Sequence, residues 1–384
     1  MKNRRGGEKL PPESKYKRRF SLNWESFAVN KAITEDKKTF AEQRALGVLA
    51  FLITTCIWGF AFIAQKSAMD YIGVFTMNGL RSLLGAVFLV PVIVISDLIK
   101  GKKPSVLGVK DPKDKKFLLV GGLLCGVFMT LASTLQQYGV KETTVTKAGF
   151  LSALYIIIVP VITVFFGKKI GWNGWAGVAI GILGMFLLCF NLGELKDLSI
   201  NKGDLIIIVC SFFFSIHILV IDKYSPATDA IRLSCIQFIV CGVTCTILAF
   251  SFENPQWENI KAAGFAIFFA GVDSCGIGYT LQMVGQKFVP AHIAPLLMGL
   301  ECVFSLIADW IFYQKLMTAQ EYIGCLLIFI AIILAQLDFS AFVKKPAEAA
   351  GTTGTVGTAK AIGTTETAGK AGKSADATAE ADEK

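Results

Sequence analysis

Acidic side chains inside long apolar runs are the residues of this chain most able to do chemistry. Glu301 lies about eleven residues into the run 290–312, and Asp273 lies about ten residues into the run 263–285. A rise of about 1.5 Å per residue puts Glu301 roughly 16 Å along a helix, close to the middle of a bilayer. A charge at that depth costs about 2.5 to 3.5 kcal/mol on insertion scales, so each carboxylate needs a reason to be there.

Two roles are open for these carboxylates. By depth, Glu301 and Asp273 could reach the same layer, where one or both could hold the cationic group of a small molecule or exchange a proton. The alternative is a protonated or hydrogen-bonded carboxyl that holds helices together. The helical face around Glu301 carries mostly small or adaptable residues, as expected of a surface packed against other helices.

The other polar and aromatic candidates are few. Arg81 could bind an anion or pair with a carboxylate, although a snorkelling or structural arginine near the outer leaflet is favoured. His217 and His292 could relay protons near neutral pH, but His292 lies nine residues from Glu301 and faces nearly the opposite side of that helix. Trp58 could line or gate a cavity, or simply pack. Without a CxxC pair, the sequence predicts no metal site and no cofactor.

The composition indicates which elements carry these residues. The chain has 384 residues, of which 53% are hydrophobic and 17% are charged. Soluble domains have nearer a quarter charged residues, and here the charges gather in the termini and connectors. The apolar windows between them predict ten membrane-spanning helices: 45–66, 75–98, 117–138, 146–166, 172–190, 204–221, 230–252, 263–285, 290–312 and 320–339.

The distribution of Lys and Arg predicts the orientation of these spans. Twelve basic residues lie in the connectors on the side of the N-terminus, and seven lie in the opposite connectors. Basic connectors stay in the cytoplasm. We therefore expect a multi-pass protein of the cell (inner) membrane with both termini cytoplasmic.

An internal repeat relates the two halves of the chain. Leu135-Gln136 with Gly139 and Lys141 returns at a constant offset of 146 as Leu281-Gln282 with Gly285 and Lys287. The similarity continues through the following spans, with one inserted residue before the last of them. The repeat unit has five spans, an odd number, so two units in tandem must cross the bilayer in opposite directions.

The repeat also places candidate residues at matching positions. Tyr155 corresponds to Glu301, and Gln136 corresponds to Gln282. A central cavity lined by these four side chains could bind a zwitterion or a hydroxylated metabolite. The glutamines could equally serve only to bridge helices.

Prolines and glycines suggest where the helices bend or approach closely. Breaks or bends in spans 4 and 9 are expected at Pro160, Pro290 and Pro295. Close helix contact is expected along a stripe in span 5 formed by Gly177, Gly181 and Gly184.

Several motifs resemble those of the EamA-type transporters of the drug/metabolite transporter superfamily. The first is Ile57-Trp-Gly-Phe-Ala-Phe62 in span 1, and the second is Asn78-Gly-Leu-Arg81 at the start of span 2. The paired spans 4–5 and 9–10 extend the resemblance over about residues 45–339. It implies ten helices in two inverted halves around a central cavity, moving small metabolites, amino acids or drugs.

The expected function is therefore secondary transport by alternating access, because no Walker A sequence is present to use ATP. One alternative is transport of anions such as nucleotide-sugars or organic phosphates, which needs several buried basic residues where only Arg81 qualifies. Another is an integral-membrane enzyme, which needs HExxH or clustered acids, so no enzyme is expected. The expected partners are a small-molecule substrate and the lipid bilayer, with no nucleic acid; a homodimer is an open alternative.

The sequence divides the chain into four parts. Two EamA-like five-helix repeats, 45–190 and 204–339, follow a basic cytoplasmic N-terminal tail, 1–44, and precede a low-complexity tail, 340–384. The basic tail could form an interfacial helix, although a solvated tail is favoured. The Ala/Thr/Gly-rich C-terminal tail cannot bury enough apolar surface to fold, so it is predicted to be disordered.

Overall fold

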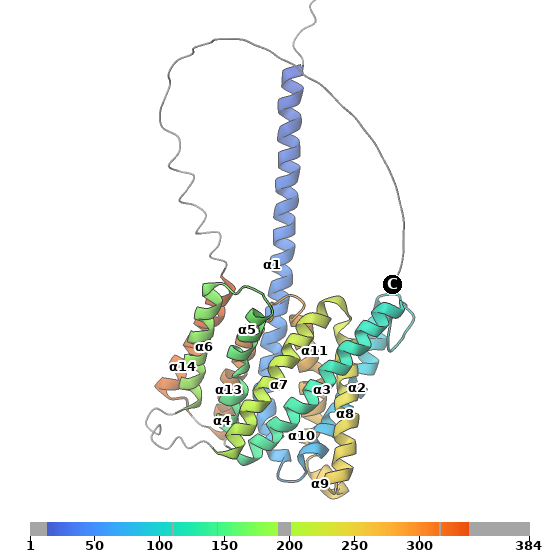
Figure 1. Ribbon diagram of the computed structural model, residues 1–384, viewed down its shortest axis with the longest axis vertical. Helices are drawn as coiled ribbons and strands as arrows, with labels where there is room; N and C mark the ends of the chain where they lie inside the picture. Colours follow the sequence, from blue (N-terminus) through green and yellow to red (C-terminus); the bar gives the residue numbers. More distant parts are fainter. Residues whose placement is uncertain (1–13, 110, 144, 191–200, 315, 338–384) are drawn as a thin grey trace, which may run out of the picture. The chain divides into compact units, whose positions relative to one another are not determined.

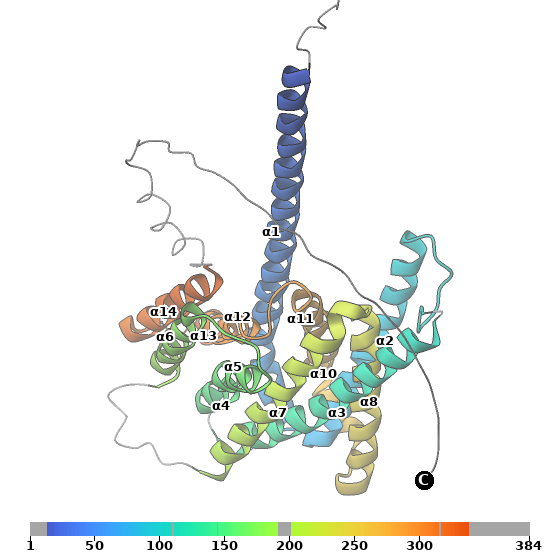
Figure 2. The same ribbon diagram turned by 45° about the horizontal axis from the view of Figure 1, so that its top comes forward.

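The computed structural model describes a bundle of helices joined by short connectors (Figures 1 and 2). The described residues are 14–109, 111–143, 145–190, 201–314 and 316–337. All of them belong to one unit, Met1–Leu337, and no strand occurs among them. The predictions for the C-terminal tail fall outside these residues.

The helices follow one another in an order that matches the predicted spans. The first half contains α1 (Ser14–Ala68), α2 (Val74–Ile99), α3 (Pro112–Glu142), α4 (Val145–Ser152), α5 (Tyr155–Phe165) and α6 (Trp172–Cys189). The second half contains α7 (Lys202–Tyr224), η2 (Ser225–Ala227), α8 (Ala230–Phe252), α9 (Trp257–Ala262), α10 (Gly264–Phe268), the π-helical η3 (Phe269–Tyr279), α11 (Thr280–Gly285), α12 (Ala294–Met298), α13 (Leu300–Tyr313) and α14 (Ala319–Gln336).

The prediction of ten membrane spans is confirmed. Ten helical segments in the described part of the chain, from Ala41–Ala68 to Ala319–Gln336, are long and apolar enough to cross a bilayer. Large apolar side chains such as Phe165 and Phe265 stay exposed on the outside of the bundle, as lipid-facing residues do. The chain is therefore an all-α, multi-pass membrane protein.

The first helix starts well before the first predicted span. α1 begins at Ser14 and continues without interruption to Ala68, so the described part of the basic tail is helical. Whether that tail lies on a membrane surface stays a prediction. Residues 1–13 lie outside the described part of the chain.

Corresponding helices α6 and α14 lie side by side and run in opposite directions (Figures 1 and 2). At one end of the pair, Asn173 Nδ2 donates a hydrogen bond to the Leu337 carbonyl at 2.7 Å. At the other end, Gln320 Nε2 donates to the carbonyl of Phe190. Gln320 is the counterpart of Asn173, and Leu337 is the counterpart of Phe190. The two ends of the pair are thus held by equivalent hydrogen bonds between corresponding residues.

Glycines allow α6 and α14 to pack closely between those ends. A Cβ atom added at Gly184 would lie 2.9 Å from the Gly324 carbonyl oxygen, and one added at Gly324 would lie 2.7 Å from the Gly184 oxygen. Real Cβ atoms do not come so close, so each glycine is required by the backbone of the other helix. The span 5 stripe makes the close contact that its spacing predicts.

Helices α2 and α8 are also corresponding helices that pack antiparallel. Near the end of α2, Asp97 accepts two hydrogen bonds from Arg232 Nη2 at 2.7 Å. Just after α8, Glu253 accepts from the Thr76 backbone N–H at 2.8 Å and from the Thr76 hydroxyl at 2.6 Å. When α2 and α8 are aligned from their first residues, Val74 and Ala230, Glu253 corresponds to Asp97 and Arg232 corresponds to Thr76. An acid therefore fastens each end of this pair.

Candidate functional site

Spans 4 and 9 are both interrupted, and the interruptions fall at the same point of the repeat. Span 4 is divided into α4 and α5, and Ile156 N bonds to the Ala153 carbonyl three residues back at 2.9 Å. Span 9 is divided into α12 and α13, and Cys302 N makes the matching bond to the Gly299 carbonyl at 3.2 Å. Such bonds replace the regular helical ones locally. Interrupted membrane helices are tolerated where protein encloses them or where they line a cavity.

Tyr155 and Glu301 lie directly after these two interruptions and contact each other. The Tyr155 hydroxyl donates a hydrogen bond of 2.8 Å to Glu301 Oε1. The two side chains are 3% and 6% exposed, so the contact is shielded from solvent. The repeat predicted an acid and a phenol at matching positions, and the structure brings the two groups together.

The interruption of span 4 does not lie at Pro160, the proline that was expected to break or bend this span. Pro160 lies inside α5, five residues after that helix begins. Its ring can disturb only the bond to Ile156, and the interruption lies before that residue. In span 9, Pro295 occupies the first turn of α12, where a proline is well tolerated. Span 4 is therefore not broken at Pro160, and the alternative of a bend there stays a prediction.

The glutamines predicted to share the cavity make matching contacts of their own. Gln136 Nε2 lies 3.4 Å from the Ser152 hydroxyl, and Gln282 Nε2 lies 3.7 Å from the Met298 sulfur. Ser152 and Met298 are themselves counterparts in the repeat. Each glutamine joins its helix to the segment just before an interruption, and the described hydrogen bonds do not connect either one to Glu301. These contacts match the helix-bridging alternative.

Trp58 packs against an aromatic ring that sequence reasoning missed. The rings of Trp58 and Tyr279 have centroids 4.6 Å apart, and Trp58 is 7% exposed. Tyr279 ends the π-helical segment η3, whose Gly278 carbonyl accepts a hydrogen bond from the Thr54 hydroxyl at 3.0 Å. Insertions of π-helix occur frequently at functional sites. The apolar pattern of this span gave no sign of the insertion.

Arg81 lies enclosed between helices. Its side chain is 2% exposed, and Nη1 donates a hydrogen bond of 2.6 Å to Gln65 Oε1. Gln137 Nε2 donates to the same oxygen at 3.2 Å. Arg81 does not snorkel, because its guanidinium stays inside the protein, while the alternatives of a structural arginine and of an anion-binding residue stay predictions. Gln65 and Gln137 were missed because polar residues are ordinary so near the ends of spans.

Asp273 is not brought to Glu301 by any hydrogen bond of the described residues. It is half-buried within η3, and no hydrogen bond of the described residues joins it to Tyr155 or Glu301. The insertion of π-helical turns rotates the residues of this span relative to a regular helix, so depth alone could not place Asp273.

The two histidines lie in different surroundings. His217 is fully buried, and its Nε2 lies 2.7 Å from Gln237 Oε1. His292, in the connector before α12, is half-buried, and burial lowers its pKa below the ordinary 6.5 while Asp222 partly opposes that effect. Among the described residues, no group of His, Cys, Asp and Glu side chains is arranged to hold a metal ion.

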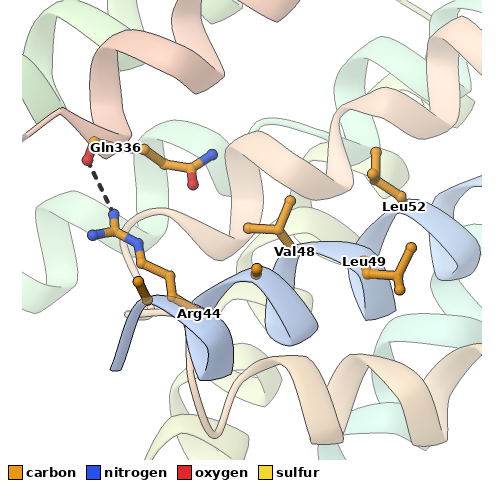
Figure 3. Close-up of a pocket in the computed structure, with 7 residues that line it drawn as sticks. Arg44, Val48, Leu49, Leu52 and Gln336 are labelled. Atoms are coloured by element: carbon orange, nitrogen blue, oxygen red, sulfur yellow. Dashed lines mark hydrogen bonds between the residues drawn. The ribbon is translucent and has the colours of Figure 1, made fainter. Parts of the chain in front are cut away.

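A groove lies where the membrane part of α1 begins, beside the end of α14 (Figure 3). Its volume is about 460 Å³, and its lining residues include Val48, Leu49 and Leu52. Arg44 Nη2 closes one side by donating to the Gln336 carbonyl at 3.3 Å. The groove is distant in sequence from the interrupted helices and contributes none of the residues described above.

Comparison with known proteins agrees with the fold. The model of the EamA-like transporter family matches this chain twice, at residues 45–190 and 201–337. The chain belongs to this family. Each match contains five of the ten predicted spans, and the second begins just before α7.

Individual members of the EamA family are similar over most of the chain. An uncharacterized transporter of Archaeoglobus fulgidus is 24% identical over 296 residues, which are 77% of this chain and 87% of the relative. The uncharacterized transporter YoaV of Bacillus subtilis is 25% identical over 297 residues, or 76% of this chain and 97% of the relative. A protein crystal structure, 17% identical, superimposes with a TM-score of 0.62 over 78% of this chain and 98% of that chain, which shows a shared fold.

Proposed function

We propose that this EamA-family protein is a secondary transporter that moves small metabolites, amino acids or drugs across the cell membrane by alternating access. The observation that carries the proposal is the duplicated interruption of spans 4 and 9, with Tyr155 and Glu301 in contact just after it. Interrupted helices paired across two repeats are typical of the binding region of secondary transporters.

The pairing of corresponding helices supports two inverted halves. α2 packs antiparallel to α8, and α6 packs antiparallel to α14, each pair with reciprocal bonds at its two ends. Two copies of one unit, oriented oppositely around a shared site, can exchange conformations and so open the site to either side in turn.

In this mechanism Glu301 is the central acid. It would hold the cationic group of a substrate or a proton, and Tyr155 would orient the carboxyl. The solute leaves the protein chemically unchanged, so the chain is not an enzyme. The excess of Lys and Arg in the connectors on the side of the N-terminus supports cytoplasmic termini.

The test is flux into proteoliposomes that contain the full chain or the Glu301→Gln variant. A transporter gives saturable, competable uptake of an unaltered solute, and the variant loses the uptake or its pH dependence while remaining folded. Chemical conversion of the solute would establish an enzyme instead. Normal flux by Glu301→Gln at every pH would make the carboxylate structural.

A further inference from the structure

Two arginines are buried in the described part of the chain. The positive charge of one is balanced by carboxylates, and that of the other is not. Arg232 lies 2.7 Å from Asp97 and 3.1 Å from Asp229, so two carboxylates balance its charge. Arg81 has no described carboxylate within ion-pair distance, and its bonded partner is the neutral amide of Gln65. Of the two buried arginines in the described residues, one is therefore paired with carboxylates and the other is not.

A neutral amide does not compensate a buried guanidinium. The side chain has five N–H donors, and an uncompensated charge in a membrane interior is costly. The Nε donor of Arg81 has no hydrogen-bond partner among the described residues. Arg81 thus keeps both its charge and part of its donor capacity for a group that carries a negative charge. A planar carboxylate matches that donor geometry.

Further donors without a described partner lie on the helices that hold Arg81. Asn78 precedes Arg81 by one turn of α2 and is fully buried, and neither end of its amide is hydrogen-bonded in the described structure. The buried Trp58 Nε1 is also without a described partner. Trp58 packs against Tyr279 at a tilt of 50°, and it lies on α1, the helix that also carries Gln65, the partner of Arg81. The two helices joined by the Arg81–Gln65 bond therefore also carry an amide and an indole whose donors have no described partner.

We propose that Arg81, Asn78 and Trp58 bind the carboxylate end of a small organic monoanion that this protein transports. This inference rests on the proposed function, since an enclosed Arg81 meets a solute only when the helices separate during alternating access. One unbalanced cation matches one negative charge. Arg232 is already paired, so no second buried arginine remains in the described chain for a phosphate or a nucleotide-sugar.

The first test uses three probes that share a phenyl ring but differ in charge. The purified full chain is heated with 3-phenylpropionate, with its neutral amide 3-phenylpropionamide, or with the cation phenethylamine. A ligand that binds the folded state raises its melting temperature. We expect stabilisation by the carboxylate and not by the amide. No stabilisation by the carboxylate, or stabilisation by the cation alone, overturns the proposed substrate class.

Variants then assign the binding to Arg81. Arg81→Gln is expected to abolish stabilisation by 3-phenylpropionate, and Arg81→Lys to weaken its binding at least about tenfold, because a lysine cannot bind a carboxylate through a planar fork. Lys141→Gln, which removes an exposed charge at the end of α3, is the control and should bind normally. Equal binding by wild type and Arg81→Gln would remove Arg81 from the site.

Two further readouts separate this role from other possibilities. If Arg81 is a binding residue, Arg81→Gln without probe melts no lower than wild type, because an uncompensated charge has been removed; a structural arginine would lower the melting temperature. Proteoliposome uptake of labelled 3-phenylpropionate tests transport itself. Binding without uptake would contradict the proposed function and leave the carboxylate site in place.

Discussion

The Tyr155 hydroxyl donates its hydrogen bond to Glu301, the residue that occupies the same place in the other half of the chain. In the proposed inverted repeat, two counterparts can touch each other only close to the axis that relates the two halves. Under this proposal the contact marks where the halves meet, directly after the interruptions of spans 4 and 9. A group at such a point belongs equally to both halves and can respond to movement of either.

Removal of the Tyr155 hydroxyl tests whether this contact matters for transport. Hydrogen bonds to charged groups contribute about 1.5 to 3 kcal/mol, so Tyr155→Phe should slow flux by roughly ten- to a hundredfold if the bond orients Glu301 during transport. Tyr138→Phe, at an exposed position of α3, is the matched control and should transport normally. Equal rates for both variants would show that the hydroxyl is dispensable.

The glycine contact between α6 and α14 makes a prediction about stability. Gly184→Ala places a methyl group against the Gly324 carbonyl, and overpacking of this kind costs about 1 to 3 kcal/mol. The variant should melt at a lower temperature in detergent. Gly264→Ala is the control, since an added Cβ meets nothing within 4 Å there. An unchanged melting temperature for Gly184→Ala would mean that these helices are not closely packed in the membrane protein.

The buried ion pair at the end of α2 should be far more important for stability than an exposed one. Asp97→Asn leaves the Arg232 guanidinium enclosed with Asp229 as its remaining acid, so a clear drop in melting temperature is expected. Lys261→Gln breaks the exposed pair with Glu258 and should have little effect. The measurement is the melting temperature of each variant by thermal unfolding. Similar decreases for Asp97→Asn and Lys261→Gln would argue against a special role for Asp97 in stability.

His292 predicts how stability depends on pH. Because burial lowers its pKa from 6.5, protonation costs more in the folded protein than in the unfolded chain. The unfolded state then binds more protons below about pH 6.5, so stability is complete above that pH and falls as the pH decreases.

Melting temperatures measured from about pH 8 to about pH 5 should decline less steeply for His292→Gln than for wild type. The difference in slope between the two proteins should vanish at the upper end of this range, where the histidine is neutral in both the folded and the unfolded state. Parallel curves would show that another group sets the pH dependence.

Hydropathy and the repeat predicted much of this architecture for physical reasons. A bilayer requires about 20 apolar residues per helix, and that requirement leaves ten clear windows in the sequence. The offset of 146 predicted that Tyr155 and Glu301 are counterparts, and their side chains do meet. Residues far apart in the chain can be matched in this way only because the same unit is present twice.

The partners of Arg81 could not be predicted by the same means. Its bond to Gln65 depends on how α1 and α2 are rotated against each other, and apolar periodicity is weak in helices that are hydrophobic on every side. The π-helical η3 shifts the register of Asp273 and Tyr279 without any signature in the apolar pattern. Rotation and register thus decide the polar contacts, whereas hydropathy decides only the spans.

The two fastened ends of the α2–α8 pair are not chemically equal. One is a buried ion pair between Asp97 and Arg232, and the other joins Glu253 to the backbone and hydroxyl of Thr76, which carry no charge. The two ends of this pair are therefore held by different kinds of bond, an ion pair at one end and neutral donors to a carboxylate at the other. If the two halves rock against each other as we propose, we expect the end held by the ion pair to open less readily than the end held by Glu253 and Thr76.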